Sequence, residues 1–307
     1  MACLSVAWHP CESEFRAAMR IVDAHVHLYP PEINRDPAAW ATAHGESHWA
    51  EMCTRTRKNG GPVQTFPTVD ELLREMDRAG VEHAVLLGWY WNTPEACALQ
   101  NAFYAERVRA HPQRLSAFAT WHPRCGVEEL RRARDAGLCG LGELSPHSQG
   151  FQTTAPEFAL VLELCAEFRW PVNLHVTDPD SRPYPGRVET PLAEFLVLAR
   201  QFPTVNFILA HWGGRLPMKD RSALELSNLY YDTAATPLLY RSEIWNQFLA
   251  EVPSSRVIFG SDFPLNLYPR VDQTPVMRRL IDEAISGAVG EGIFAHNIER
   301  LLARARS

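Results

Sequence analysis

The chain has 307 residues, of which 46% are hydrophobic and 21% are charged, so it can bury one large core. This length suits either two ordinary domains or one α/β barrel. The formal net charge of -6 argues against a nucleic-acid partner, which would need a clustered basic face, and favours a small-molecule substrate. We expect no membrane partner, because the sequence holds no run of about 18 apolar residues.

The cysteine pattern bears on the cellular compartment. Seven cysteines are scattered through the chain, and none belongs to a Cys-x-x-Cys pair. An odd number at irregular spacing fits reduced thiols. The N-terminal residues lack a basic start followed by an apolar core, so we expect a cytoplasmic protein. The sequence leaves the oligomeric state open, with a homo-oligomer as one possibility.

Along the chain, strand-like apolar runs alternate with helical stretches, which is typical of successive βα units on a parallel sheet. Strands buried on both faces read as near-continuous apolar segments. Eight parallel strands close a (β/α)8 TIM barrel. We therefore predict one α/β barrel domain over residues 1–307, with residues 1–20 as an N-terminal extension. The eight runs cover residues 21–27, 81–88, 114–120, 139–144, 171–176, 205–211, 228–233 and 256–261.

The region 30–67 follows the first run and is rich in Pro, Trp, His and Arg, with little periodicity. A loop this long in a compact domain is usually functional, and the βα loops of a barrel line its catalytic face. The sequence therefore predicts a lid here, although a solvated excursion with aromatic anchors fits the same composition. The side chains that would reach a substrate are Trp40, His44, His48, Trp49, Arg55, Arg57 and Lys58.

Three helices are predicted after this region. Thr68 and Glu71 have the spacing of a capping box, and Gly80 can end the helix that this box opens. Apolar residues at helical spacing also indicate helices over 127–136 and 157–168.

The predicted first strand carries His25 and His27 in a His-x-His pattern, which places both imidazoles on one side of the strand. Two satisfied histidines on a half-buried strand would give the same pattern. However, His175, His211 and Asp262 each end another apolar run. A buried polar side chain needs a partner, and a shared metal ion would supply one for all of them.

Three short motifs along these runs resemble the amidohydrolase superfamily, in its amidohydrolase-related branch. They are Val-Asp-Ala-His-Val-His at 22–27, Ala-His-Trp-Gly-Gly at 210–214 and Phe-Gly-Ser-Asp-Phe-Pro at 259–264. The segment 294–302, which contains Asn297, is similar to the closing helix of that branch. The resemblance covers the chain from Ile21 onward.

This resemblance implies a (β/α)8 barrel that binds a divalent metal ion, commonly zinc, which activates a water molecule. Imidazole nitrogens and carboxylate oxygens suit zinc, which makes water a nucleophile near neutral pH. By the same resemblance, Asp262 would both ligate the metal and take the proton from that water. His211 would ligate a second ion or polarise the substrate.

The fourth strand bears on the number of metal ions. Many binuclear relatives bridge two ions there with a carboxylated lysine, whereas this chain has Glu143, which resembles the bridging Glu of the TatD-type and phosphotriesterase-homology branches. The resemblance then implies His25, His27 and Asp262 on one ion and His175 and His211 on the other. The alternative is one ion on His25, His27, His175 and Asp262, with Glu143 holding a loop or the substrate.

Other polar and aromatic side chains follow the same strands and are candidates for substrate binding. Barrel mouths also hold aromatic residues for packing, and loop arginines are often only solvated. Arginine side chains in the loop after the fifth strand can bind a carboxylate or phosphate in bidentate fashion. The candidates are Trp121, His122, His147, Arg182, Arg187 and Trp212.

The leading functional hypothesis is a metal-dependent hydrolase that cleaves a C–O or C–N bond in a small carboxylate-bearing or cyclic substrate, such as an ester, lactone or amide. The alternative is a metal-dependent non-oxidative decarboxylase of the same family, but such relatives generally use one metal ion and lack a fourth-strand carboxylate ligand. A TatD-type phosphoesterase fits Glu143, although the acidic chain counts against a nucleic-acid substrate. A catalytically inactive, metal-stabilised binding module is a hypothesis of another class. The complete set of catalytic residue types argues against it.

Overall fold

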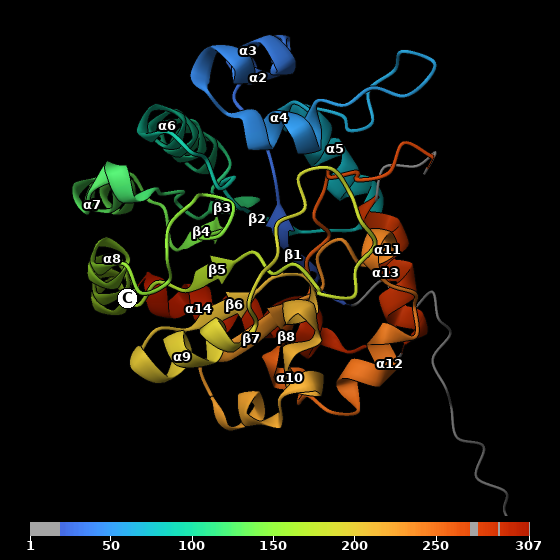
Figure 1. Cartoon of the computed structure of the whole chain (residues 1–307). Coiled ribbons are helices and arrows are strands. Elements are labelled where there is room, and N and C mark those ends of the chain that lie inside the picture. Colours follow the sequence, from blue (N-terminus) through green and yellow to red (C-terminus); the bar gives the residue numbers. More distant parts are fainter. Residues whose placement is uncertain (1–18, 271–275, 288, 307) are drawn as a thin grey trace, which may run out of the picture.

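Eight parallel strands form the centre of the molecule, as the sequence predicts (Figure 1). The computed structural model describes residues 19–270, 276–287 and 289–306, so the predicted extension over residues 1–20 lies almost wholly outside the described residues. Each strand lies within one of the eight predicted runs and is shorter than it. The strands are β1 (Val22–Val26), β2 (His83–Leu86), β3 (Leu115–Ala117), β4 (Leu141–Leu144), β5 (Val172–Leu174), β6 (Phe207–Leu209), β7 (Leu229–Asp232) and β8 (Val257–Ile258).

The strands pair in chain order as β1 to β3 and as β4 to β8, and backbone hydrogen bonds join these two groups at both seams. Between β3 and β4, the Ala119 N–H donates to the Gly140 carbonyl at 2.8 Å. Between β8 and β1, the Ala24 N–H donates to the Phe259 carbonyl at 2.9 Å, and the Asp262 N–H donates to the His25 carbonyl at 2.8 Å. The strands therefore form a ring, which is the predicted TIM-barrel class.

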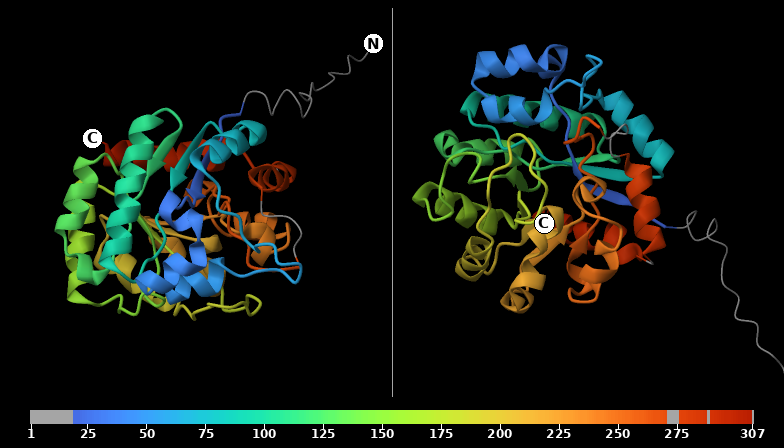
Figure 2. Two further views of the ribbon diagram at one scale, coloured as in Figure 1. Left: turned by 90° about the horizontal axis from the view of Figure 1, so that it is seen from above. Right: turned by 45° about the vertical axis from the view of Figure 1, so that its right-hand side comes forward.

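Helices alternate with the strands and surround them (Figures 1 and 2). The predicted capping box is present, because Thr68 accepts from the Glu71 N–H and Glu71 accepts from the Thr68 N–H. The α-helices are α2 (Pro31–Arg35), α3 (Pro37–His44), α4 (Ser47–Cys53), α5 (Val69–Ala79), α6 (Pro94–Ala110), α7 (Glu128–Asp135), α8 (Pro156–Phe168), α9 (Ala193–Gln201), α10 (Leu216–Lys219), α11 (Thr236–Leu239), α12 (Ile244–Leu249), α13 (Met277–Ser286) and α14 (Asn297–Ala305). Shorter helical segments are η1 (Pro123–Cys125), η2 (His211–Arg215), η3 (Arg221–Glu225), η4 (Ser254–Arg256) and η5 (Gly292–His296).

The strand residues alternate between two apolar layers. Ala84 and Leu86 of β2 pack in the core that includes the surrounding helices, whereas Val85 and Leu87 pack with residues of α14. Asn297 at the start of α14 donates to the carbonyls of Ser254 and Val257 at 2.8 and 2.7 Å. Helix α14 is thereby bound to the start of β8, and it lies on the opposite side of the barrel from the α2–α4 region (Figure 2).

The region 30–67 is not the irregular loop that its weak periodicity predicts. It contains α2, α3 and α4, and its tryptophans form a small core with Trp91, in which the rings of Trp40 and Trp49 each lie 5.4 Å from that of Trp91. The buried Glu46 carboxylate accepts from the backbone N–H groups of Asn92 and Thr93. Aromatic contacts, which have no simple sequence period, therefore hold this region against the barrel.

None of the helices in the described part of the chain is both long and apolar enough to cross a membrane.

Candidate metal centre

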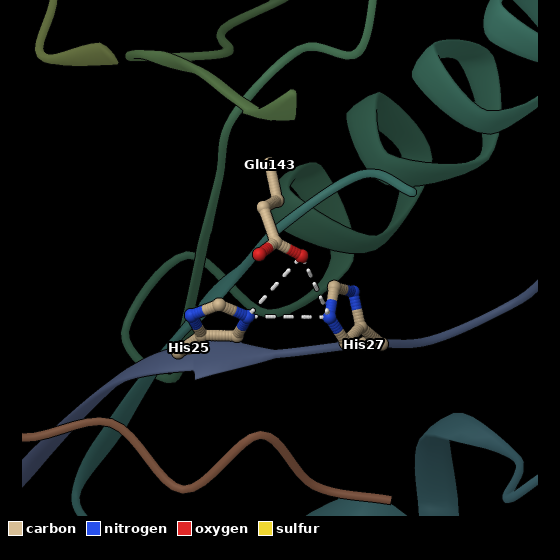
Figure 3. Close-up of side chains that lie close together, drawn as sticks. All are labelled: His25, His27 and Glu143. Atoms are coloured by element: carbon tan, nitrogen blue, oxygen red, sulfur yellow. Dashed lines mark hydrogen bonds and ion pairs between the residues drawn. The ribbon is translucent and has the colours of Figure 1, made fainter. Parts of the chain in front are cut away.

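Six buried side chains converge where the strands end. β1 supplies His25, His27 follows directly after β1, and β4 supplies Glu143. Figure 3 shows these three side chains pointing toward one another from facing segments. The other three follow β5, β6 and β8 in the chain. They are His175, His211 and Asp262, and the six side chains range from fully buried to 9% exposed.

The first pair of imidazoles faces one oxygen of Glu143. The Nε2 atoms of His25 and His27 are 3.2 Å apart, and each lies 3.7 Å from Glu143 Oε2. Asp262 Oδ1 lies 3.3 Å from His27 Nε2 and 3.7 Å from His25 Nε2. Two nitrogens bound to one zinc ion at about 2.0–2.1 Å lie roughly 3.3 Å apart in tetrahedral geometry, so this pair fits a shared ion.

The second pair of imidazoles faces the other oxygen of Glu143. His175 Nδ1 and His211 Nε2 are 3.2 Å apart, and they lie 2.9 and 3.5 Å from Glu143 Oε1. The Glu143 carboxylate thus lies between two similar nitrogen pairs, one at each oxygen. This arrangement provides two groups of donors rather than one.

The opposite nitrogens of these rings determine which atoms face the centre. His27 Nδ1 lies 3.0 Å from the Leu87 carbonyl, and His211 Nδ1 lies 3.2 Å from the Ala234 carbonyl. A carbonyl only accepts, so the proton of each neutral ring is on Nδ1 and the lone pair of Nε2 faces the centre. His25 Nδ1 is held in the same way by Asp232 Oδ2 at 2.9 Å. His175 is reversed, with Nε2 at 3.2 Å from the Thr177 hydroxyl and Nδ1 facing Glu143.

The electrostatics of this cluster favour a bound cation. Both oxygens of the buried Asp262 carboxylate lack a hydrogen-bond partner among the described residues. Burial acts to raise the pKa of Asp262, but the neighbouring His25 and His27 side chains hold it below its ordinary value. Likewise, burial opposes ionisation of Glu143, yet His175 and His25 hold its pKa well below the ordinary value. Two buried, ionised carboxylates among four converging imidazole nitrogens fit a divalent metal ion, which would take the place of the imidazole protons.

The chain matches one known family over most of its length. The amidohydrolase family model matches residues 22–304. The chain belongs to the amidohydrolase family. Members of this family are metal-dependent enzymes. The sequence matches none of the curated proteins at a significant level.

Solved structures with the same fold include two decarboxylases and a hydrolase. The 2,6-dihydroxybenzoate decarboxylase from Rhizobium is 19% identical, with a TM-score of 0.64 over 93% of this chain and 99% of that chain. A dihydroxybenzoic acid decarboxylase from Polaromonas sp. JS666, with bound manganese and the inhibitor 2-nitroresorcinol, is 18% identical, with a TM-score of 0.66 over 94% and 98% of the two chains. A probable 2-pyrone-4,6-dicarboxylic acid hydrolase from Acinetobacter baumannii, with bound citric acid, is 15% identical, with a TM-score of 0.63 over 93% and 100%. At these identities the similarity shows a shared fold.

The backbone of this amidohydrolase is strained at two of the six side chains. His211 and Asp262 have φ angles of 57° and 65°, in the left-handed region that non-glycine residues rarely adopt. In the Ala-His-Trp-Gly-Gly motif, the left-handed turn continues through Gly213, where a Cβ atom would lie 2.7 Å from the Tyr231 ring. The motif therefore allows the chain to turn sharply after β6, so that His211 faces the centre.

A small pocket leads to the six side chains. Five of them line it: His27, Glu143, His175, His211 and Asp262. Its outer wall is mainly aromatic and aliphatic, and no arginine or lysine is among the described residues that line it. The wall residues include Met52, Trp89, Tyr90, Val176, Tyr184, Leu239, Leu265 and Leu267.

Four of the candidates for substrate binding are engaged elsewhere, and none is among the described residues that line this pocket. The indole N–H groups of Trp121 and Trp212 donate to the Gly126 carbonyl and the Thr236 hydroxyl. His122 Nδ1 accepts from the Arg124 N–H, and His147 lies 3.3 Å from Glu194. Their role in substrate binding remains a prediction that this geometry does not support.

The two loop arginines differ in position. Arg187 is bound within its own loop, to the Ser181 hydroxyl and the carbonyls of Asp178 and Pro179. Arg182 lines a separate groove outside the pocket. Of the side chains predicted to reach a substrate from the region 30–67, Arg57 and Lys58 line this groove, whereas Trp40 and Trp49 are buried in the aromatic core.

Sequence reasoning missed Asp232 and Asn173, which support the first pair of imidazoles. Asp232 Oδ2 binds His25 Nδ1 and also accepts from Asn173 Nδ2 at 3.0 Å, while Asp232 Oδ1 accepts from the His211 N–H at 3.0 Å. One carboxylate therefore orients both halves of the centre. The signal was present, because Asp232 ends the seventh apolar run in the same way that His175, His211 and Asp262 end theirs.

Proposed function

We propose that the chain is a metal-dependent hydrolase with two divalent ions, which cleaves the C–O or C–N bond of a small ester, lactone or amide. The observation that carries this proposal is the position of Glu143 between two nitrogen pairs, each 3.2 Å apart. His25, His27 and Asp262 would hold one ion, His175 and His211 the other, and Glu143 would contact both. The ions would supply Lewis acidity and lower the pKa of water toward neutrality.

Asp262 would act as the general base. Its carboxylate lines the pocket, accepts no hydrogen bond from the described residues, and has a pKa below its ordinary value because of the neighbouring histidines, although burial acts in the opposite direction. It is therefore ionised and able to take a proton from the attacking water. His211 Nδ1 lies 3.7 Å from Asp262 Oδ2. His211 would use Nε2 to hold an ion or, when that nitrogen is protonated, to polarise the substrate carbonyl group.

We further propose zinc as the resident ion, since imidazole nitrogens and carboxylate oxygens are its common ligands and tetrahedral geometry fits both nitrogen pairs. The manganese in the Polaromonas decarboxylase makes manganese the main competitor. We retain the cytoplasm as the proposed location, on the irregular cysteine spacing alone.

A non-oxidative decarboxylase is the second candidate. Two structures with the same fold are decarboxylases of dihydroxybenzoates, and the aromatic wall formed by Trp89, Tyr90 and Tyr184 would suit an aromatic acid. Glu143 counts against this candidate, because a single ion does not need a carboxylate between two nitrogen pairs.

Metal content and activity separate the two candidates. Elemental analysis of the purified protein gives the ions per chain, and a screen of esters, lactones and amides beside dihydroxybenzoates gives the reaction. Two ions per chain with hydrolysis would support our proposal. One ion per chain with release of carbon dioxide would replace it with the decarboxylase. Metal-free protein that keeps full activity would contradict both.

A further inference from the structure

A basic groove lies outside the pocket, at the same face of the barrel. Loops that follow α4, β5, β7 and β8 form its walls, and Leu239 lines both the groove and the pocket. The groove has a volume of about 1080 Å³, slightly above the range of roughly 300–1,000 Å³ that is typical of small-molecule sites. The described residues that line it are Thr56, Arg57, Lys58, Asn59, Asp180, Arg182, Pro237, Leu238, Leu239, Tyr240, Arg241, Tyr268, Pro269 and Arg270.

The charge of this groove is opposite in sign to that of the chain. Among the described residues that line it, five side chains are cationic and one is acidic, whereas the whole chain has a net charge of -6. The acidic one, Asp180, is already bound to Arg215 at 2.6 Å and to Lys219 at 2.7 Å. The groove therefore presents a local positive potential to an approaching ligand.

Backbone contacts fix the walls that carry these charges. Arg57 donates to the Pro269 carbonyl at 2.6 Å, and Arg55 donates to the Leu267 carbonyl at 2.5 Å. These bonds join the loop after α4 to the loop after β8. These carbonyl contacts fix the position of the wall that Arg57 shares with the loop after β8.

Of the cationic side chains that line the groove, Arg182 is the closest in sequence to a residue that lines the pocket. It lies between Ser181 and Tyr184, both of which line the pocket. It is exposed and forms no ion pair with the described carboxylates, while Arg187 holds the base of the same loop. An extended ligand could thus reach from the pocket to this guanidinium group over the apolar surface of Leu239.

We propose that the groove binds an anionic group at the far end of the substrate, while the reacting bond lies at the inner pocket. The pocket itself offers aliphatic and aromatic walls but no cationic side chain among the described residues. The substrate class is then an ester or amide with an apolar spacer that ends in a carboxylate or a phosphate. This inference rests on the proposed function for the reaction, but the binding of the anion can be measured without it.

Chromogenic substrate pairs test the inference in the holoenzyme. The 4-nitrophenyl monoesters of glutarate, adipate and suberate carry a free carboxylate, and their methyl diesters do not. We expect a lower KM for the free acids, and Arg182→Gln should raise that KM about fivefold while the KM of the methyl diesters stays unchanged. Arg182→Glu should raise it further, and added salt should weaken the preference. Phosphate-terminated analogues of the same length show which anion is preferred.

A matched control is Arg109→Gln. Arg109 is exposed in the last turn of α6, whose C-terminal end lies at the face of the barrel opposite the groove. This variant removes the same charge and should leave the KM of every substrate unchanged. Equal KM values for free acids and methyl diesters in the wild type, or equal effects of the Arg182 and Arg109 variants, would overturn the inference.

Calorimetry separates failure of the groove from failure of the proposed reaction. The probes are α,ω-dicarboxylates from glutarate to sebacate and the monocarboxylates of the same length, each titrated into the holoenzyme. We expect the dicarboxylates of one intermediate length to bind at least fivefold more tightly than their monocarboxylates, and Arg182→Gln to abolish the difference. If this difference is found but no ester or amide is hydrolysed, the groove binds the anion as proposed and the proposed hydrolase activity is wrong. If dicarboxylates and monocarboxylates bind equally well, the proposal that the groove binds an anion is wrong, whatever reaction the protein catalyses.

Discussion

His25 and His27 form the enclosed half of the centre, in which only His27 lines the pocket. His175 and His211 form the open half, in which both rings line it. Carboxylates contact the enclosed half from two sides, since Asp232 binds His25 from behind and Asp262 lies 3.3 Å from His27. Both rings of the open half face Oε1 of Glu143. Their opposite nitrogens contact the Thr177 hydroxyl and the Ala234 carbonyl, neither of which is charged.

A carboxylate attracts a divalent cation more strongly where burial lowers the local dielectric constant. His25 and His27 are at most 1% exposed, whereas His211 is 3% exposed and His175 is 9% exposed. Because the two halves differ in burial and in nearby negative charge, two ions bound in this centre would not be equivalent. The ion of the enclosed half would be held more tightly, and the ion of the open half would exchange more readily and contact the substrate. The predictions below test that contrast.

The largest effect on activity is expected from a change at the proposed general base, Asp262. Asp262→Asn keeps the size of the side chain but removes the charge that takes the proton, so kcat should fall by about 10²–10⁴-fold. Metal content must be measured on the same sample, because Asp262 also belongs to the enclosed half. Asp135→Asn, an exposed change on α7, is the control and should keep full activity. Unchanged activity of Asp262→Asn toward any identified substrate would show that the catalytic assignment is wrong.

The next effect concerns Glu143, which joins the two halves. Glu143→Gln removes one negative charge from both nitrogen pairs, and the open half has no other carboxylate as close as the 2.9 Å between Glu143 and His175. We expect metal content to fall from two ions to one per chain, with a loss of activity of about 100-fold.

Glu46→Gln is the matched control for this change, because Glu46 is a fully buried carboxylate that binds backbone N–H groups rather than the centre. It should lower thermal stability and leave the metal content unchanged. Elemental analysis of both variants measures the number of ions per chain. Retention of two ions by Glu143→Gln would contradict a bridging role for Glu143.

Asp232 tests the support of the enclosed half. Asp232→Asn keeps an oxygen that can accept from His25 but removes the charge behind the ring, so the affinity of the tighter ion should fall about 10–100-fold. Competition with a chelator measures it. An equal loss of affinity at both ions would contradict the contrast between the two halves. It would mean that Asp232 supports both of them, through the His25 ring and the His211 N–H.

The sequence predicted the parts of this structure that depend on periodicity and strand ends. All eight strands lie within their predicted runs, and His25, Glu143, His175 and Asp262 meet because parallel strands bring their carboxyl ends to one edge. Asp232 followed the same rule and was overlooked because it belongs to no family motif that we recognised.

The loops could not be predicted in the same way. Trp40 and Trp49 read as possible substrate contacts but form a core with Trp91, and that packing depends on distant segments rather than on local spacing. Trp121 and Trp212 follow strands as the metal-binding side chains do, yet their indole N–H groups bind Gly126 and Thr236 instead. The direction of a side chain just beyond a strand is set by the turn that follows, and a single sequence does not specify it.

The smallest effect is expected in the open half, at Thr177. Its hydroxyl lies 3.2 Å from His175 Nε2 and orients the ring toward Glu143. Thr177→Val keeps the shape of the side chain and removes one neutral hydrogen bond, which contributes about 1 kcal/mol, so the affinity of the weaker ion should fall about fivefold. The tighter ion should be unaffected, because neither His25 nor His27 contacts this hydroxyl. Thr153→Val, at a buried hydroxyl that donates to Glu194, controls for the loss of a hydrogen bond elsewhere. A change at the tighter ion alone would reverse the order of the two halves, since it would mean that the ring of His175 supports the enclosed ion rather than the open one.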